Sequence, residues 1–464
     1  MTALMQEVLS PLPTIMVDVV ELGVRPKRGW LGCQITGNVE FNISDLESYC
    51  FATWDPVVYD AMLVAAAVEY ADKTKRRPAL LWQRDITLRI PVHDVRRWTD
   101  GQVLSTLHSA LVLLTGDRWD IQFYARRKAE VSPSQGQFSL PANVKAVIPF
   151  SDGLDSCAVA GIMARSLGDT LVRVRIGTKQ YDGRAASGHR LPFTSIPYRL
   201  RASDKAFVES SARSRGFKFA LISGLAAYLA KAGTVILPES GQGALGPALV
   251  TVGQGYEDYR SHPLFTGAMQ RFLNALLGHN VRYTFPRLWH TKAETLREFV
   301  ETCEDRSSWS KTWSCWQQNR HVSVDGVKRH CGICAACLLR RLSVHAAGLQ
   351  EAETTYVWER LTATKFRDGV APGFPKRKIT GKLREYAIAG VLHLDHLACL
   401  RTSPANLQPL NLAAFQLGRS LDLSQTEARQ RLDRLLIQHE TEWITFVKSL
   451  GANSFITEWA AHSP

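Results

Sequence analysis

The sequence predicts an α/β fold organised around a parallel sheet with helices on both faces. One observation is that apolar runs of strand length alternate with helical segments from about residue 143 to about residue 291. A second is that a turn rich in Ser, Asp and Gly joins the strand at 146–150 to a helix that begins at Leu154. Ligands of such sheets lie beyond the carboxyl ends of the strands.

Length and composition limit the number of domains. The 464 residues, of which 45% are hydrophobic and 21% charged, suit two or three domains of a soluble globular protein. We expect an N-terminal mixed α/β domain for binding or assembly (1–140), a central parallel-sheet domain (141–348) and a mainly helical C-terminal extension (349–464). The Ser-, Pro- and Gly-containing segment 132–137 is the expected linker between the first two.

The N-terminal domain contains a clear helix start at Asp55-Pro56, because Asp can cap the first turn and Pro suits the first helical position. This helix is expected to continue towards Lys73. The further elements expected here are a half-buried strand over 86–90, a helix over 103–114 that ends at Gly116, and a strand over 119–124. No catalytic motif is present in this domain.

The central domain is expected to bring three loops into one crevice: 151–156, the stretch after Ile176, and the loop from Pro238. Its further strands are predicted at 170–176, 234–237 and 281–284, and its helices at 206–212, 219–231, 264–277 and from Thr291. In the C-terminal extension, helices are predicted over 411–419, 424–436 and 442–450.

The loop Ser151-Asp152-Gly153-Leu154-Asp155-Ser156 has the properties of a phosphate site. The first N–H groups of a helix have no partner within the helix, and the helix dipole places partial positive charge there. Gly153 lets the backbone approach a ligand closely, and Ser151 and Ser156 add hydroxyl donors. The alternative is an ordinary strand-to-helix turn that Asp and Ser merely cap.

The loop that starts at Pro238-Glu239-Ser240-Gly241-Gln242 and continues to Asp258-Tyr259-Arg260 is long and glycine-rich for a simple connection. It carries carboxylate, amide, aromatic and guanidinium groups, which together could bind a flat polar heterocycle. A surface loop without a ligand explains the same composition equally well.

Cys315, Cys331, Cys334 and Cys337 form a spacing typical of a metal site. Two successive two-residue spacings bring three thiolates around one ion, and the fourth comes from upstream. Four thiolates complete the tetrahedral shell of Zn²⁺, so the zinc would be structural rather than catalytic. Iron–sulfur ligation and unliganded thiols are the alternatives, and His321 and His330 are spare ligands. The scattered Cys33, Cys50, Cys157, Cys303 and Cys399 are expected to be small buried hydrophobes.

The formal net charge of +13 suits an anionic partner such as a nucleotide, a nucleic acid or an acidic protein surface. No dedicated nucleic-acid motif accompanies it. The basic clusters 73–77, 126–128 and 376–378 are each expected to be solvated surface. Acidic residues interrupt the apolar N-terminus and no long uncharged apolar run occurs, so we expect a cytoplasmic protein with no signal peptide and no membrane partner.

The order Ser-x-Gly-x-Asp-Ser after a strand resembles the pyrophosphate loop of ATP-pyrophosphatase (PP-loop) enzymes, which is usually Ser-Gly-Gly-x-Asp-Ser. It is not a Walker loop, because no Gly-Lys-Ser/Thr follows. The resemblance implies cleavage of ATP between the α and β phosphates and transfer of AMP to a carboxylate or carbonyl oxygen. Asp152 departs from the pattern, since the family has Gly there. Its carboxylate could point outward, bind Mg²⁺ or weaken nucleotide binding.

About 160 residues after that loop follow Ser314-Cys315-Trp316 and a Cys-Gly-x-Cys-x-x-Cys-x-x-Arg segment at 331–340. This combination resembles the 7-cyano-7-deazaguanine synthase (QueC) family over roughly 144–345. Thr291-Lys292-Ala293-Glu294 is similar to that family's Thr-Lys-x-Glu helix start, and Tyr259-Arg260 lies where its substrate loop would fall. The gap between Cys315 and Cys331 is longer than is usual in the family.

The resemblance implies conversion of 7-carboxy-7-deazaguanine to the amide and then the nitrile with ATP and ammonia. AMP transfer activates the carboxylate, and Mg²⁺, backbone N–H groups and cations shield the phosphate charge. The implied cofactors are ATP, Mg²⁺ and structural Zn²⁺. By resemblance we assign Ser151, Asp152, Gly153, Leu154, Asp155, Ser156 and Ile176 to ATP, with Asp155, Ser156 and Lys292 as catalytic residues, and Glu239, Gln242, Asp258 and Arg260 to the substrate.

The regions outside the resemblance distinguish two variants of this function. Housekeeping members are little more than the central region, whereas here about 140 residues precede it and about 115 follow. Such extensions resemble the QueC-like proteins of bacterial antiviral systems, which are implied to couple a deazaguanine to an amine of a partner protein. The alternatives are a plain 7-cyano-7-deazaguanine synthase, a non-catalytic nucleotide-binding assembly protein, and a tRNA thiolation or amidation enzyme. A homodimer is compatible with each.

Overall fold

The computed structural model describes residues 12–41, 46–49, 55–78, 82–128, 138–177, 189–203, 206–210, 213–252, 256–317 and 322–460. They form two compact units, each built from segments far apart in the sequence. The first unit comprises Met1–Ser151, Leu167–Leu237 and Asp258–Thr284, and the second comprises Asp152–Ser166, Pro238–Glu257 and Phe285–Pro464. The division into three consecutive domains at 140 and 348 stays a prediction.

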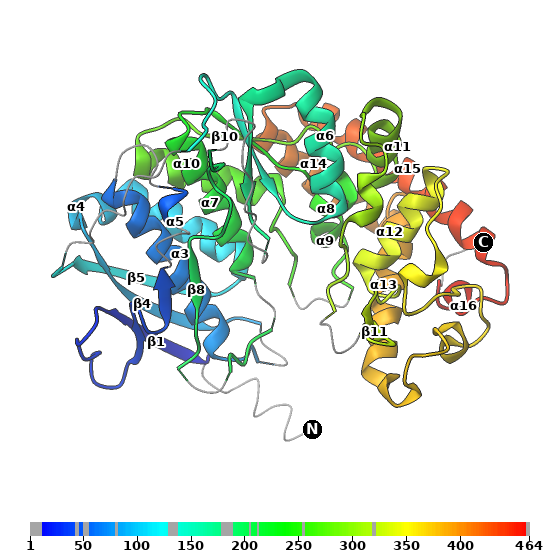
Figure 1. The fold of residues 1–464 in the computed structure, drawn as a ribbon, viewed down its shortest axis with the longest axis horizontal. Coiled ribbons are helices and arrows are strands. Elements are labelled where there is room, and N and C mark those ends of the chain that lie inside the picture. The colour runs from blue at the N-terminus through cyan, green and yellow to red at the C-terminus, as the bar shows by residue number, and fades with distance from the viewer. Residues whose placement is uncertain are drawn as a thin grey trace. The chain divides into compact units, whose positions relative to one another are not determined.

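The first unit contains a four-stranded sheet in the order β2-β1-β4-β5, with all neighbours parallel. Its strands are β1 (Thr14–Val20), β2 (Leu31–Gln34), β4 (Asp85–Val92) and β5 (Arg118–Ala125). Helix α3 (Pro56–Thr74) packs against β4 and α5 (Gly101–Thr115) packs against β5 (Figure 1). The predicted strands at 86–90 and 119–124 and both predicted helices are therefore confirmed, whereas β1 and β2 were not predicted.

The start of α3 follows the predicted cap. Asp55 has extended backbone angles and its carboxylate accepts the Val57 N–H at 3.1 Å, with Pro56 at the first helical position. Alternating burial along β4 gives Ile86, Leu88 and Ile90 exposures of 1%, 0% and 0%, which confirms the half-buried strand.

The second sheet of the first unit has the order β10-β9-β6-β7 and is parallel throughout. Its strands are β6 (Ala146–Phe150), β7 (Leu171–Arg175), β9 (Thr234–Ile236) and β10 (Arg282–Thr284), and helices α7 (Arg215–Leu229) and α10 (Pro263–Leu277) connect them. The carboxyl ends of β6 and β7 lie at one edge, where the Ile176 N–H donates to the Phe150 carbonyl at 3.0 Å. The parallel sheet predicted from the alternation of strands and helices is confirmed.

One predicted helix of this unit is wrong. Residues 206–210 are described and form no helix. The backbone N–H groups of Val208 and Glu209 donate to the Lys73 carbonyl, each at 3.1 Å, so pairing with a distant segment replaces local helical bonds. The smaller elements of this unit are α4 (Val95–Trp98) and the antiparallel pair β3 (Val39–Phe41) and β8 (Tyr198–Leu200).

The second unit is mainly helical, as expected for the C-terminal extension. Helix α15 is continuous over 26 residues where two helices were predicted, and α13 was not predicted. The elements are α6 (Leu154–Leu167), α8 (Gly241–Ala244), α9 (Gly246–Leu249), α11 (Lys292–Thr302), β11 (Ser323–Val324), β12 (Val327–Lys328), α12 (Ala335–Ala346), α13 (Gly381–Cys399), α14 (Leu407–Leu421), α15 (Gln425–Leu450) and α16 (Phe455–Trp459).

Three buried clusters hold these helices. One surrounds the four clustered cysteines and includes Trp358 and Trp443. A second joins α14 and α15 to Leu288. The third joins α6 to α11 through Leu154, Leu296 and other buried side chains. The segments that carry the predicted nucleotide and metal residues of this unit are thus fixed by apolar packing.

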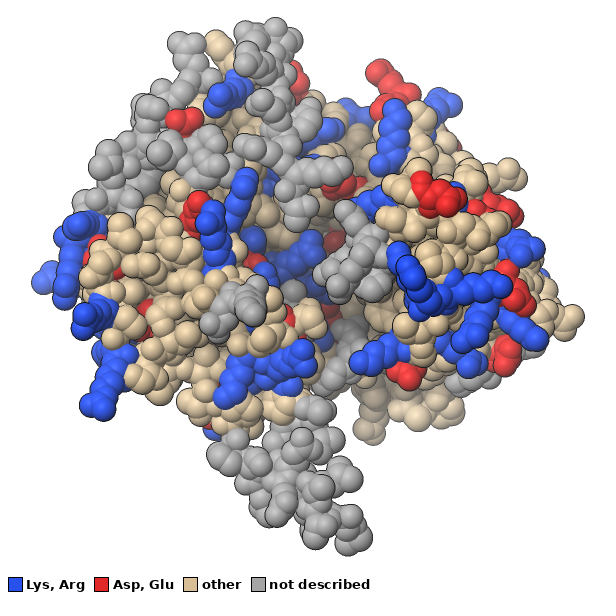
Figure 2. Space-filling view, turned by 60° about the horizontal axis from the view of Figure 1, so that its bottom comes forward, with Lys and Arg blue, Asp and Glu red and all other residues tan. Residues whose placement is uncertain are grey.

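Lys and Arg side chains cover more of the face in Figure 2 than Asp and Glu do, in line with the net charge of +13. The expectation that every basic cluster is solvated is wrong for Arg77, whose side chain is 4% exposed and pairs with Asp72 and Asp117. Arg126, with a 5% exposed side chain, likewise lies beside Glu21. No helix among the described residues combines the length and apolar character needed to cross a membrane.

Candidate nucleotide and metal sites

The predicted phosphate loop lies between the end of β6 at Phe150 and the start of α6 at Leu154. Leu154 is 2% exposed and packs in the cluster between α6 and α11, which anchors the start of the helix. Ser156 is buried, whereas Asp155 lies in the first helical turn with a side chain that is 13% exposed. In the first turn of α6, Leu154 therefore packs inward and the Asp155 side chain is partly accessible.

Helix α11 brings Lys292 to Asp155. Thr291 caps this helix in a reciprocal capping box, since its hydroxyl accepts the Glu294 N–H at 3.2 Å and the Glu294 carboxylate accepts the Thr291 N–H at 2.8 Å. Lys292 follows as the first helical residue, and its Nζ forms an ion pair with Asp155 Oδ2 across a sequence separation of 137 residues. Two predicted catalytic residues are thus in direct contact.

Several buried polar atoms of the second unit lack hydrogen-bond partners among the described residues. Asp155 Oδ1 is buried and has no hydrogen-bond partner in the described part of the chain, and the same holds for Ser240 Oγ, His290 Nδ1 and Glu442 Oε2. Buried polar atoms in native proteins are rarely left unpaired. Carboxylate oxygens are the ligands that Mg²⁺ prefers, so the oxygen of Asp155 without a partner among the described residues is of the type that such an ion takes.

Asp152, the residue that departs from the pyrophosphate loop pattern, is exposed. Its backbone carbonyl accepts the Trp313 N–H at 2.6 Å, which ties the loop to the segment just before Cys315. Because the Asp152 side chain is exposed, its carboxylate does not fill the place of a phosphate inside the loop.

Gln242 is 3% exposed and both ends of its side-chain amide are bonded within the chain. Its Oε1 accepts the Lys292 N–H at 2.8 Å, and its Nε2 lies 2.8 Å from His439 Nδ1. His439 Nε2 in turn donates to the Leu394 carbonyl at 2.9 Å, and burial lowers the pKa of His439 to about 4. His439 is therefore neutral, with its proton on Nε2 and Nδ1 accepting from Gln242.

Helix α15 also contacts the cap of α11. The Thr291 hydroxyl donates to Glu442 Oε1 at 2.7 Å, and Gln438 Nε2 donates to the same oxygen at 3.0 Å. Burial raises the pKa of Glu442. Arg434 pairs with Glu294 and donates to the Trp289 carbonyl at 2.7 Å. Sequence reasoning missed Arg434 and Glu442, because their partners on the cap of α11 lie 140 and 151 positions away in the sequence and no local pattern marks them.

The other predicted substrate residues have the following contacts. Glu239 is half-buried, with its carboxylate beside Gly243. In the first unit, Asp258 accepts from Arg260 Nε at 2.8 Å and from Arg213 Nη1 at 3.2 Å. Although burial acts to raise it, Arg260 and Arg213 hold the pKa of Asp258 below its usual range. Their roles towards a substrate stay predictions.

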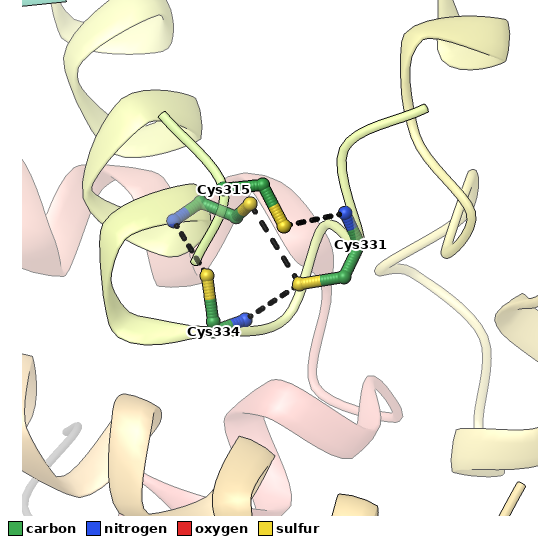
Figure 3. Close-up of side chains that lie close together, drawn as sticks. Cys315, Cys331 and Cys334 are labelled. Carbon is green, nitrogen blue, oxygen red and sulfur yellow. Dashed lines mark hydrogen bonds between the residues drawn. The ribbon is translucent and has the colours of Figure 1, made fainter. Parts of the chain in front are cut away.

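Cys315, Cys331, Cys334 and Cys337 are all buried, and their sulfur atoms lie within 4.8 Å of one another. Figure 3 shows the labelled Cys315, Cys331 and Cys334 directed towards a common centre. Cys331 Sγ and Cys337 Sγ are 3.7 Å apart, close to the roughly 3.8 Å edge of a tetrahedron with Zn–S bonds of about 2.3 Å. The donor set of four sulfurs therefore fits a structural zinc with no open position.

Backbone N–H groups point at three of these sulfurs, at 3.3 Å from Cys331 to Cys315, 3.3 Å from Cys334 to Cys331 and 3.4 Å from Cys337 to Cys334. Bonds from neighbouring thiols hold the pKa of Cys315 below its usual range, while burial raises those of Cys331 and Cys337. A bound dication would offset the buried negative charge of four thiolates. Gly332 permits the tight turn, since its φ is +85°.

Hydrogen bonds of a buried arginine connect the segments around the cluster. Arg340, which is 0% exposed, bonds Glu351 Oε1 at 2.7 Å and Thr312 Oγ1 at 2.7 Å, and so joins α12 to the segment that leads to Cys315. His330 is buried, and its Nδ1 has no hydrogen-bond partner among the residues that the structure describes, whereas His321 lies outside them. Of the scattered cysteines, Cys33 and Cys303 are buried as expected, Cys157 and Cys399 are only partly buried, and Cys50 lies outside the described residues.

Comparison with protein families finds a match to part of the chain. Residues 244–348 match the family model described as queuosine biosynthesis protein QueC. The matched segment includes Lys292 and the four clustered cysteines, whereas the loop at 151–156 and the C-terminal extension lie outside it. No curated protein and no solved structure matches the chain. The match supports a QueC-like, ATP-using enzyme with a zinc-binding segment.

Proposed function

We propose that the protein is a QueC-like enzyme that uses ATP to adenylate the carboxylate of a 7-deazaguanine and then delivers the activated group to an amine. The contact between Asp155 and Lys292 carries the proposal, because it joins the pyrophosphate loop motif to the Thr-Lys-x-Glu helix start across 137 positions. The unpaired Asp155 Oδ1 and the QueC match over 244–348 add support.

The proposed reaction needs anions to be aligned and their charge to be reduced. A carboxylate oxygen of the substrate attacks the α-phosphorus of ATP, the bond from that phosphorus to the bridging oxygen breaks, and pyrophosphate leaves. The amine then attacks the carbonyl carbon of the acyl-adenylate, AMP leaves with the carboxylate oxygen, and the nitrogen loses a proton. Ammonia in this step gives an amide, which a second activation dehydrates to the nitrile.

Each residue has a physical role in this proposal. The N–H groups at the start of α6 and the hydroxyls of Ser151 and Ser156 bind phosphate oxygens. Lys292 supplies a cation to the phosphates, and Asp155 holds Lys292 until ATP arrives. Mg²⁺ bound with ATP would find an oxygen ligand at Asp155 and would reduce the phosphate charge.

The amine in our proposal belongs to a partner protein of an antiviral defence system, and the extensions on either side of the central region would hold that partner. A plain synthase would use ammonia alone. Intact mass spectrometry of proteins co-expressed from neighbouring genes separates the two, because only the first adds a deazaguanine to a protein.

The primary test is incubation of the protein with 7-carboxy-7-deazaguanine, ATP, Mg²⁺ and ammonia, with AMP and pyrophosphate measured by chromatography. We expect substrate-dependent AMP release that falls by roughly 100-fold or more in Lys292→Met and Asp155→Ala. The exposed Lys311→Met is the matched control and should retain wild-type turnover. Absence of both AMP release and ATP binding in the wild type would refute the proposal.

A non-catalytic nucleotide-binding protein is the second candidate, and Asp152 favours it because a carboxylate stands where phosphate loops of this kind have glycine. This candidate predicts an inactive wild type and the appearance of AMP release in Asp152→Gly. Turnover by the wild type excludes it.

A further inference from the structure

One face of α15 lies against the segments that carry Lys292 and Gln242. Arg434, Gln438 and Glu442 are spaced by four residues, as are Leu435 and His439, so these side chains share one side of the helix. Gly241 shows how close the approach is, because a Cβ there would lie 2.2 Å from the Leu288 carbonyl and 2.4 Å from Leu435 Cδ2. This face belongs to the C-terminal extension, outside the matched segment 244–348.

The first path from α15 to Lys292 runs through His439 and Gln242. Because His439 Nε2 donates to the Leu394 carbonyl at 2.9 Å, its Nδ1 is left to accept a hydrogen bond from Gln242 Nε2 at 2.8 Å. The amide of Gln242 then has one orientation, in which Oε1 faces the Lys292 N–H at 2.8 Å. His439 therefore determines which atom of Gln242 meets the start of α11.

The second path runs through Glu442 and Thr291. Thr291 is 0% exposed, and its hydroxyl group donates a hydrogen bond to Glu442 Oε1 at 2.7 Å. The lone pair of that hydroxyl is then available to the Glu294 N–H at 3.2 Å, which completes the cap. Glu442 thus fixes the rotation of the capping hydroxyl immediately before Lys292.

We propose that His439 and Glu442 are positioning residues for Lys292, so that the C-terminal extension completes the nucleotide site. The inference rests on the proposed function, because it gives Lys292 a role at the phosphates. His439 orients Gln242, which accepts the Lys292 N–H, and Glu442 accepts from Thr291, the cap of α11. Lys292 Nζ pairs with Asp155 at the end of its side chain. A shift of the Lys292 backbone therefore moves the point from which the ammonium reaches the loop.

The experiment compares His439→Leu with His439→Asn, and Glu442→Leu with Glu442→Gln. Asn can offer an oxygen to Gln242 as His439 Nδ1 does, and Gln can accept from Thr291 as Glu442 does. Glu440→Gln makes the same chemical change on the same helix at a side chain paired with Arg401 and is the control. Two quantities are measured in the full-length chain: hydrogen exchange of the segment 288–298, and kcat and KM for ATP in AMP formation.

In the leucine variants we expect the Lys292 amide, or the amides of its cap, to exchange roughly 5- to 10-fold faster than in wild type, because one hydrogen bond is lost. A displacement of the ammonium by about 1 Å should lower kcat by roughly 10- to 100-fold, more than it raises KM for ATP. The Asn and Gln variants should recover most of both quantities, and Glu440→Gln should match wild type.

Equal losses in the leucine variants and their polar counterparts, or unchanged exchange at 288–298 in all of them, would overturn the positioning role. If the leucine variants do not fold, the Asn, Gln and Glu440→Gln variants still test the proposal. It requires that all three keep hydrogen exchange and kcat close to the wild-type values. A wild type that releases no AMP, with exchange altered as expected, refutes the proposed function and still supports the two hydrogen-bonded paths.

Discussion

The ion pair between Asp155 and Lys292 can be tested without any substrate by a double-mutant cycle with Asp155→Asn, Lys292→Met and the double variant. Both side chains are 13% exposed, so the pair is largely removed from water. Lys292→Met leaves Asp155 with no partner at either oxygen, because Oδ1 already has none among the described residues. Breaking a buried pair from one side costs about 3–5 kcal/mol at full burial, and with the residual exposure here we expect about 2–3 kcal/mol.

The double variant should cost less than the sum of the single variants, because neither charge is then left alone. We expect a coupling free energy of about 1–3 kcal/mol from urea unfolding followed by tryptophan fluorescence. The exposed pair Arg431 and Glu427, with side chains 45% and 42% exposed, is the matched control and should couple by only about 0.3–0.5 kcal/mol. Additive losses at Asp155 and Lys292 would refute the reasoning that the pair is a preformed unit.

ATP binding to the same variants is a second measurement, in which the effect of Asp155→Asn on affinity should reverse when Mg²⁺ is added. Without Mg²⁺, Asp155 repels the phosphates, so Asp155→Asn should bind ATP up to about 10-fold more tightly than wild type. With Mg²⁺, the variant has lost an oxygen ligand and should bind more weakly. Isothermal titration calorimetry measures both, and the same direction of change in both conditions would contradict a magnesium role for Asp155.

Three further outcomes are expected. Cys334→Ser should lower the zinc content measured by mass spectrometry of the metal and reduce stability, and an unchanged zinc content would contradict the ligand set. Burial lowers the pKa of His439 from 6.5 to about 4. Between these two pH values the unfolded chain binds more protons than the folded chain, so the free energy of unfolding falls as the pH is lowered. We expect a loss of about 2 kcal/mol between pH 7 and pH 5 that is absent in His439→Asn, and equal pH dependence in both proteins would contradict this. Gly241→Ala should cost about 1–3 kcal/mol through contact with Leu288 and Leu435, whereas Gly381→Ala, which meets nothing within 4 Å, should be neutral or stabilising in thermal unfolding.

Local patterns predicted much of the fold. The alternation of strands and helices predicted the parallel sheet that contains β6, β7, β9 and β10, because strand and helix periodicities are properties of neighbouring residues. The Thr-Lys-x-Glu sequence predicted the start of α11, where Thr291 and Glu294 form the capping box. Cysteine spacing predicted a cluster whose sulfurs meet within 4.8 Å.

The predictions that were wrong concern segments whose structure depends on partners far away in the sequence. The two helices predicted over 424–436 and 442–450 leave a gap at 437–441, yet α15 continues through it, and Gln438 and His439 in this gap have hydrogen-bond partners. Residues 206–210 have helical composition but pair with Lys73. The link from His439 to Gln242 spans 197 positions, and no feature near either residue indicates the other.

The close approach of α15 to Gly241 constrains how this protein can evolve. A side chain larger than hydrogen at 241, or a residue at 439 that cannot accept from Gln242, has to be accompanied by a compensating change on the opposite segment. The last two helical turns before 442 and the segments that carry residues 241, 242 and 291 should therefore be inherited together. A chimaera that exchanges the C-terminal helices between homologues should lose stability unless residues 241, 242 and 291 come from the same parent.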